Sequence, residues 1–387
     1  MIQCEACGAA THAIKKHLTE DDCTISNIEE YKTLYPEAPI YSQELLDINA
    51  SRKVSMAGSA TAVKNGTVVD LNATQHKPIT DLIGKDDQRL YTSKSVKAGK
   101  KEPIRVSVLG KSEYDYMIPE ADNNHIWDIE MLKDILMGID DLNTPVLVWG
   151  HSGTGKTRSL ENIASLTNRP LIRVQHTVNT EESHIIGQWK VKDGNMEFEL
   201  GPLPLAMKHG WVYLADEYDF AFPSVLSVYQ PVMEGEPLLI KEADLDNRLI
   251  KPHKNFRFVA TGNTNGAGDD TGLYAGTNIQ NAANYSRFGI TVEAKYLSQK
   301  EEILMLVKRG ILIEEDATKV VEFGNLVREA FDKKEISATI GPRELINASK
   351  IGSRKSDLKA GMSLAFTNRM TPVDKEKVDK IAQRVFG

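Results

Sequence analysis

Apolar residues follow two different periods along the chain, and these periods divide it into two kinds of structure. Short β-rich runs such as "PVLVW", "LIRVQH", "WVYLADE", "FRFVATGN" and "GITVEA" alternate with stretches of helical spacing. From Ser298 onward the strand signal ends, and runs such as "EDATKVVEFGNLVREAFDKK" carry apolar residues at helical spacing. The first pattern is typical of a parallel sheet with helices on both faces. We therefore predict an α/β core over 113–295, followed by a small helical domain over 296–387.

The N-terminal part of the chain has a different character. Residues 1–40 are rich in Cys, His and Tyr, whereas residues 41–112 are rich in Ser, Thr, Ala, Gly and Lys, with Tyr41 and Tyr91 as their only aromatics. So little apolar surface favours a solvated linker over 41–112, with some short strands. The basic stretch "SKSVKAGKKEPIR" leaves open the alternative of an arm that binds nucleic acid.

Composition and charge narrow the class of protein. The 387 residues carry a net charge of -7, which gives no general reason to expect binding to nucleic acid or to an acidic membrane. No run is long and apolar enough to span a bilayer, and the start "MIQCEACGAA" lacks the regions of a signal peptide. We expect a soluble cytoplasmic protein.

A glycine-rich turn follows the β-rich run "VLVW". It fits the pattern G-x-x-x-x-G-K-[ST] with Gly150, His151, Ser152, Gly153, Thr154, Gly155, Lys156 and Thr157, and an amphipathic helix follows it. In such a turn the backbone N–H groups point at phosphate oxygens. Lys156 would neutralise the β- and γ-phosphates, and the Thr157 hydroxyl would bind Mg²⁺. The turn therefore predicts a nucleotide site.

Two acids end the run "WVYLADE". Asp216 can hold magnesium through water, and Glu217 can orient or deprotonate the attacking water. Acids at such a position can also be simple helix caps. Because they stand at the end of a second β-rich run, after the phosphate motif, we interpret them as parts of an NTP hydrolase.

Three further residues are candidates for sensing or stabilising the γ-phosphate. Asn263, at the end of "FRFVATGN", is placed to hydrogen-bond that phosphate or the lytic water, with Asn265 as its rival and a turn-forming role as the alternative for either. Arg287 could stabilise transition-state charge on a neighbouring subunit, which requires a ring. Arg343, in the first turn of a predicted helix, needs an anionic partner because cations are disfavoured there. A surface salt bridge is the alternative for each arginine.

In this order, these residues resemble the AAA+ ATPases, whose Walker B, sensor 1, arginine-finger and sensor 2 positions they match. The passages "ADEYDFAFPSVLSVYQPVMEGE" and "NRLIKPHKNFRFVATGNTNGAGDDTGLYAGTNIQNAANYSRF", with the terminal "IAQRVFG", are similar to the MoxR-type branch and, within it, to the CobS-like ATPase subunits of cobaltochelatases. The resemblance covers residues 114–387. It implies a P-loop NTPase core with a helical lid, a hexameric ring, and ATP with Mg²⁺ at the subunit interfaces.

The resemblance also implies two projecting hairpins and a partner. The first hairpin is expected in "GQWKVKDGNMEFELG", with a turn at Asp193 and Gly194, and the second in "PLLIKEADLDNRLIKP". Trp189 and Phe198 are candidate contacts to a client protein, or else core residues. The relatives work with a protein that carries a von Willebrand A-type module and with a large metal-inserting subunit. This implies a motor that remodels a partner protein, either in a cobaltochelatase-type complex or for another client.

The N-terminal segment "CEACGAATHAIKKHLTEDDC" does not belong to the motor pattern. Cys4, Cys7, His17 and Cys23 could form a tetrahedral Zn²⁺ site, with His12 as the alternative fourth ligand. With "IEEYKTLYPEAP", the segment resembles Ros/MucR-like zinc fingers; a redox C-x-x-C or unliganded cysteines are the alternatives. Its acidic "TEDDC" favours docking to a protein. Recruitment of the motor to DNA remains the second hypothesis.

Overall fold

The computed structural model describes residues 2–4, 6–7, 10–11, 28–36, 38, 61–64, 67–70, 74–192, 194–269 and 272–387. The chain divides into two compact units, Met1–Ala73 and Thr74–Gly387. The described residues of the first unit form two antiparallel strand pairs and a helix: β1 (Ile2–Gln3) with β2 (Ala10–Thr11), α2 (Ile28–Leu34), and β3 (Thr61–Lys64) with β4 (Thr67–Asp70).

Only part of the predicted zinc site falls on described residues. Cys4 is buried and Cys7 is exposed, while His12, His17 and Cys23 lie outside the described residues. Among the residues that are described, no group of three or more His, Cys, Asp or Glu side chains is arranged to hold a metal ion. The zinc finger therefore stays a prediction.

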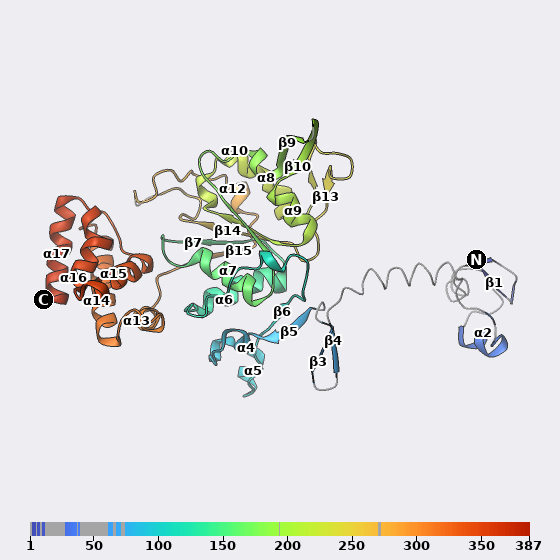
Figure 1. Ribbon diagram of the computed structural model, residues 1–387, viewed down its shortest axis with the longest axis horizontal. Coiled ribbons are helices and arrows are strands. Elements are labelled where there is room, and N and C mark those ends of the chain that lie inside the picture. The colour runs from blue at the N-terminus through green and yellow to red at the C-terminus, as the bar shows by residue number, and fades with distance from the viewer. Residues whose placement is uncertain are drawn as a thin grey trace. The chain divides into compact units, whose positions relative to one another are not determined.

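A five-stranded parallel sheet forms the centre of the second unit (Figure 1). Its strands lie in the order β15 (Ile290–Glu293), β7 (Val146–Trp149), β14 (Arg257–Gly262), β11 (Val212–Asp216) and β8 (Leu171–Gln175), and every neighbouring pair is parallel. Along a strand, successive side chains point to opposite faces. In β11, Tyr213 and Ala215 enter one core and Val212 and Leu214 enter the other, so both faces are buried. This confirms the predicted parallel sheet.

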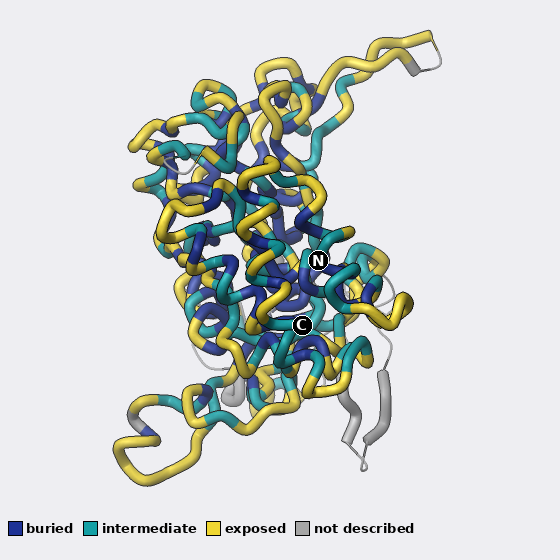
Figure 2. Tube along the Cα trace, turned by 90° about the vertical axis from the view of Figure 1, so that its left-hand side faces the viewer, coloured by how far each residue is buried: buried dark blue, intermediate teal, exposed yellow. Residues whose placement is uncertain are grey.

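Helices cover both faces of this sheet. On one face, α6 (Ile129–Leu136) and α7 (Lys156–Leu166) contribute Leu132, Ile135 and Ile163 to the core. The opposite face is covered by helices and short turns that supply the other core: α8 (Glu182–Ile186), α9 (Pro202–His209), η4 (Tyr218–Phe220), α10 (Pro223–Leu226), η5 (Ser227–Tyr229), α11 (Gln230–Met233) and α12 (Ala282–Tyr285). Buried residues are concentrated in the interior and exposed residues at the outer turns (Figure 2).

The segment before α6 differs from the polar linker predicted over 41–112. From Gln75 onward it is folded, with β5 (Gln75–Pro78) antiparallel to β6 (Arg105–Val108). Three of its apolar side chains, Ile79, Leu90 and Val106, are buried in the same core as α6. The average composition of the segment did not reveal these three residues because the segment is mostly polar, yet they pack against the α/β layers. The remaining elements here are α4 (Ile79–Ile83), η1 (Gln88–Leu90), α5 (Ser93–Lys97), η2 (Asp115–Met117) and the π-helical turn η3 (Met137–Leu142).

Two hairpins form at the predicted places. The strands β9 (Gly187–Lys192) and β10 (Asn195–Leu200) pair antiparallel, with Trp189 opposite Phe198. Gly194 at their turn has a φ of 81°, a left-handed conformation that glycine adopts without strain; Asp193 lies outside the described residues. The second hairpin pairs β12 (Leu238–Leu239) with β13 (Leu249–Ile250). Trp189 is 47% exposed, so it is not a core residue.

The C-terminal part is helical, which confirms the prediction made from the periodicity after Ser298. We call residues 299–386 the lid. A capping box between Ser298 and Glu301 starts the first helix, and Pro342 stands in the first turn of the third. The lid consists of α13 (Gln299–Lys308), α14 (Glu314–Asp332), α15 (Pro342–Lys355), α16 (Leu358–Ala365), η6 (Thr367–Arg369) and α17 (Pro372–Phe386), packed around their own core. In the described part of the chain, no helix has the length and apolar character needed to cross a bilayer.

Candidate functional site

The glycine-rich turn connects β7 to α7 at the carboxyl edge of the sheet. Gly150, Gly153 and Gly155 have φ angles of 146°, 83° and 89°, which side-chain-bearing residues rarely adopt. At Gly150 a Cβ atom would also lie 2.3 Å from the carbonyl oxygen of Ala294. These glycines therefore let the backbone curl closely around the start of α7, whose free N–H groups form an anion site.

Lys156 lies beneath this turn and is 8% exposed. Its ammonium donates hydrogen bonds to the carbonyl oxygens of Gly150 (2.6 Å) and His151 (3.0 Å) and to Oδ1 of Asn263 (3.2 Å). Burial lowers the pKa of Lys156 to about 8, against the opposing effect of the nearby acids Asp219 and Asp216. The lysine is thus a desolvated cation that a phosphate group would stabilise.

Asp216, at the end of β11, is the centre of a buried polar cluster. Its Oδ1 accepts hydrogen bonds from the hydroxyl groups of Thr157 (2.8 Å) and Thr261. Its Oδ2 accepts from Nε of Arg173 (2.8 Å), a residue of β8 that the sequence analysis missed. The structure therefore brings Thr157 and Asp216 together, as predicted, and adds a guanidinium that balances the carboxylate charge.

Glu217 follows directly and takes an unusual backbone conformation. Its φ is 53°, so the chain turns sharply after β11 and the side chain reaches the cavity described below. Its backbone N–H donates to the Thr261 hydroxyl (3.1 Å), and Nε2 of Gln175 donates to Glu217 Oε2 (3.1 Å). Gln175, at the end of β8, was also missed by sequence reasoning.

The two asparagines after β14 occupy different places. Asn263 lines the cavity, and its Oδ1 accepts from Lys156. Asn265 is exposed, and its side chain accepts from the N–H of Ala267 (3.1 Å) in a local turn. Of the two rivals, the geometry favours Asn263 as the residue that faces a nucleotide.

These groups line one cavity of about 440 Å³ between the lid and the glycine-rich turn at residues 150–157, which we call the phosphate loop. Its lining contains both apolar and charged side chains, a combination that suits a nucleoside triphosphate. The apolar lining comprises Ile126, Met131, Leu297, Met305 and Ile346, and the polar lining includes Ser152, Gly153, Thr154, Gly155, Lys156, Thr157, Asp216, Glu217, Asn263 and Arg343.

The two predicted arginines fall in different environments. Arg343, at the start of α15, lines the cavity, and its backbone N–H lies close to Gly153 of the phosphate loop. Arg287 lies beyond α12, where it forms an ion pair with Glu234 (2.7 Å) and donates to the Ala283 carbonyl oxygen. Arg287 is not part of the lining of its own cavity.

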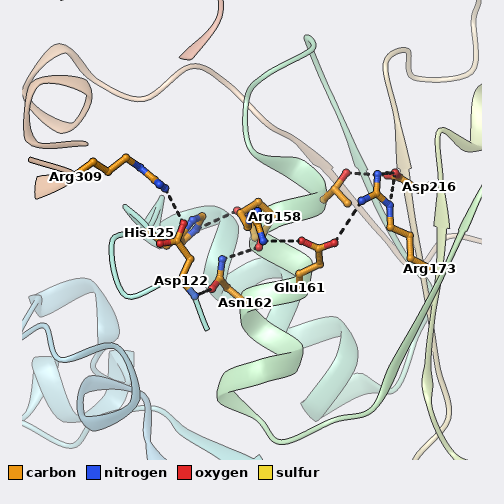
Figure 3. Close-up of polar contacts among 10 residues, drawn as sticks. Asp122, His125, Arg158, Glu161, Asn162, Arg173, Asp216 and Arg309 are labelled. Atoms are coloured by element: carbon orange, nitrogen blue, oxygen red, sulfur yellow. Dashed lines mark hydrogen bonds and ion pairs between the residues drawn. The ribbon is translucent and has the colours of Figure 1, made fainter. Parts of the chain in front are cut away.

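A chain of polar contacts links the lid to Asp216 along one wall of the cavity (Figure 3). Arg309, after α13, donates to Asp122 of the core (2.7 Å). From there the contacts continue through Asn162, Arg158 and Glu161 to Arg173, which pairs with Asp216. Next to Asp122, burial lowers the pKa of His125 to about 4, so this imidazole is neutral near pH 7. The lid and the carboxyl edge of the sheet are therefore joined by one polar network.

The pKa of Lys156 predicts that ATP binds more weakly as the pH rises. Below about pH 8 the ammonium is charged before ATP arrives, whereas above it the free protein must take up a proton on binding. We expect the Kd for Mg-ATP to rise by up to about tenfold for each pH unit above that pKa. Titration calorimetry in buffers of different ionisation enthalpy measures both the Kd and the proton uptake.

Lys156→Arg is the matched control, because a guanidinium stays charged over this range. Its ATP affinity should show no such pH dependence, whatever its absolute value. Proton uptake that is absent from the wild type at pH 9, or equal in the two proteins, would contradict the assignment of the effect to Lys156.

Comparison with known proteins agrees with this geometry. Residues 145–288 match the family model of the AAA domain (dynein-related subfamily). The chain is 32% identical over 295 residues to the aerobic cobaltochelatase subunit CobS of a Sinorhizobium species, which covers 73% of this chain and 87% of the relative. It is also 24% identical over 256 residues to midasin of Giardia intestinalis, covering 63% of this chain and 5% of that protein. The chain therefore belongs to the AAA-domain ATPases, in the family that contains the cobaltochelatase subunit CobS.

Proposed function

We propose that this protein is an ATP-hydrolysing ring motor that remodels a partner protein. The observation that carries the proposal is the convergence of Lys156, Thr157, Asp216, Glu217 and Asn263 on one cavity that the lid also lines. A phosphate loop alone would support nucleotide binding. The two adjacent carboxylates add the means to activate water, which supports hydrolysis.

The residues around Asp216 fit Mg²⁺. Carboxylate and hydroxyl oxygens are the donors that this ion prefers, and Asp216 and Thr157 already lie within hydrogen-bond distance of each other. Arg173 now balances the charge of Asp216, as a bound cation would. Thr157 and Asp216 would hold the metal, which supplies charge neutralisation at the β- and γ-phosphates when it is bound.

Each remaining side chain has a role in the proposed reaction. Glu217 accepts the proton of the attacking water, and Gln175 holds its carboxylate until that water is in place. Asn263 orients the water or the γ-phosphate. Arg343, at the start of the lid helix α15, pairs with the phosphate charge and so draws the lid toward the nucleotide. Since the lid is tied to the core through Arg309 and Asp122, a change of charge in the cavity acts directly on the lid.

The position of Arg287 supports a ring, and by family resemblance we propose a hexamer. This side chain does not line its own cavity and lies near the molecular surface, with 24% of it exposed. A guanidinium in that place can serve the nucleotide of a neighbouring copy. The two hairpins, with the exposed Trp189 and Leu245, are the proposed contacts to the partner.

The likeness to CobS suggests the kind of partner. We propose that the motor acts as the ATPase subunit of a cobaltochelatase-type metal-insertion complex, together with a protein that carries a von Willebrand A-type module. The test is phosphate release by the purified protein with Mg-ATP, followed by identification of copurifying proteins. No phosphate release above that of Lys156→Ala would refute the motor. Release that only DNA stimulates would favour the alternative of a DNA-associated motor.

A further inference from the structure

The loop between β14 and α12 is fixed at both ends by one buried residue, Asp219. Its Oδ2 accepts hydrogen bonds from the backbone N–H groups of Asn263 (2.9 Å) and Thr264 (2.8 Å) and from the Thr264 hydroxyl (2.9 Å). Its carbonyl oxygen accepts from the N–H of Asn278 (2.8 Å) and from Nε2 of Gln280 (3.2 Å). Asp219 is 0% exposed. The loop is therefore closed on an interior anchor two residues after Glu217.

Between these ends, Tyr274 reaches the phosphate loop. Its hydroxyl oxygen accepts from the backbone N–H of Ser152 (2.9 Å) and lies 2.9 Å from Nδ1 of His151. Burial, with a smaller effect of the Lys156 charge, lowers the pKa of His151, which favours the neutral imidazole. A neutral imidazole with its proton on Nε2 accepts the hydroxyl proton at Nδ1, and one with its proton on Nδ1 donates to the hydroxyl oxygen, so either tautomer makes the contact.

The imidazole of His151 is held from several sides as well. Its ring stacks on Tyr296 at 6.1 Å between centroids and contacts the edge of Phe331, a lid residue, at 6.4 Å. With Tyr274 and Tyr296 it lines a second cavity of about 380 Å³, next to the nucleotide cavity. The first half of the phosphate loop is thus supported by a neighbouring loop, by the segment after β15 and by the lid.

We propose that Tyr274 is a positioning residue for nucleotide binding. Its two hydrogen bonds hold the loop at His151 and Ser152 in the curled conformation before ATP arrives, so less ordering remains to be done on binding. Through Asp219, the same brace fixes Asn263 relative to the loop. Tyr274 does not line the 440 Å³ cavity and acts through the backbone of the loop. The inference rests on the proposed function, because it requires a nucleotide in the loop.

Tyr274→Phe removes only the hydroxyl and keeps the ring. The matched control is Tyr285→Phe: this ring packs beside Gly266 of the same loop, and its buried hydroxyl has no hydrogen-bond partner among the described residues. We expect Tyr274→Phe to raise the KM for ATP and the Kd for a fluorescent ATP analogue by about tenfold, with kcat changed less than twofold. Tyr285→Phe should match the wild type in all three.

The wild type decides which claim fails. If it does not bind the analogue, the proposed function is wrong; if it binds and Tyr274→Phe binds equally well, the brace is wrong. Nitrogen NMR of the histidine-labelled wild type, assigned with His151→Gln, tests the contact without relying on the tyrosine variant. We expect a hydrogen-bonded Nδ1 at His151 in either neutral tautomer, and an Nδ1 without a hydrogen bond at pH 7.5 would overturn the inference.

Discussion

Replacing Glu217 by Gln is expected to stop ATP hydrolysis and leave ATP binding intact. The amide has the same shape as the carboxylate but cannot accept a proton from water, so the reaction loses its general base. Such a loss costs about 10²–10⁴-fold in rate. The carboxylate of Glu217 accepts a hydrogen bond from Gln175, and the ammonium of Lys156 donates to Gly150, His151 and Asn263, so the groups that bind phosphate stay in place. Phosphate release at saturating Mg-ATP and the Kd for a fluorescent analogue measure the two effects separately.

Glu236→Gln is a suitable control for this experiment. Glu236 is an exposed glutamate of the same domain, and it does not line the cavity. The same substitution there removes one negative charge and should leave turnover unchanged. If Glu217→Gln hydrolyses ATP within about threefold of the wild-type rate, Glu217 is not the base, because a lost general base costs far more.

Arg287→Ala is expected to abolish hydrolysis through the neighbouring subunit. An arginine that stabilises phosphoryl-transfer charge is worth about 10³–10⁵-fold in kcat. Because Arg287 pairs with Glu234 and does not line its own cavity, the variant should bind ATP with wild-type affinity. Arg354→Ala, at an exposed position in the last turn of α15, is the matched control and should remain active.

Mixing two inactive variants tests the action between subunits. Lys156→Ala lacks the phosphate lysine but keeps its arginine, whereas Arg287→Ala keeps an intact cavity. At a hybrid interface the first supplies Arg287 to the cavity of the second, so the mixture should recover part of the wild-type activity. Two results would argue against the action of Arg287 on a neighbouring subunit. One is that no mixing ratio restores activity, and the other is that a monomeric wild type is fully active.

The sequence predicted those parts of the fold that local patterns determine. The five β-rich runs became the five strands of the sheet, because each is a short apolar segment bounded by turn residues. The phosphate loop and the acids after β11 were found because spacing within a few residues determines their chemistry. Their convergence follows from the parallel sheet, whose strands all end at one edge.

Contacts between residues that are distant in the sequence could not be predicted from local patterns. Arg173 and Asp216 are 43 positions apart, and Tyr274 and Ser152 are 122 apart. Arg173 carried no local signal, because it is an exposed residue of the edge strand β8, where a charged side chain needs no buried partner. Tyr274 stands in a glycine-rich loop, and nothing in its local sequence indicates that it contacts the phosphate loop.

A crystal structure of the protein with Mg²⁺ and a non-hydrolysable ATP analogue tests the account most directly. We predict that the β-phosphate lies against the N–H groups of the loop and the ammonium of Lys156. The metal should lie between that phosphate and the oxygens of Thr157 and Asp216, with Arg173 withdrawn from Asp216. An analogue bound elsewhere, or a loop left without phosphate while Arg173 stays on Asp216, would contradict the account.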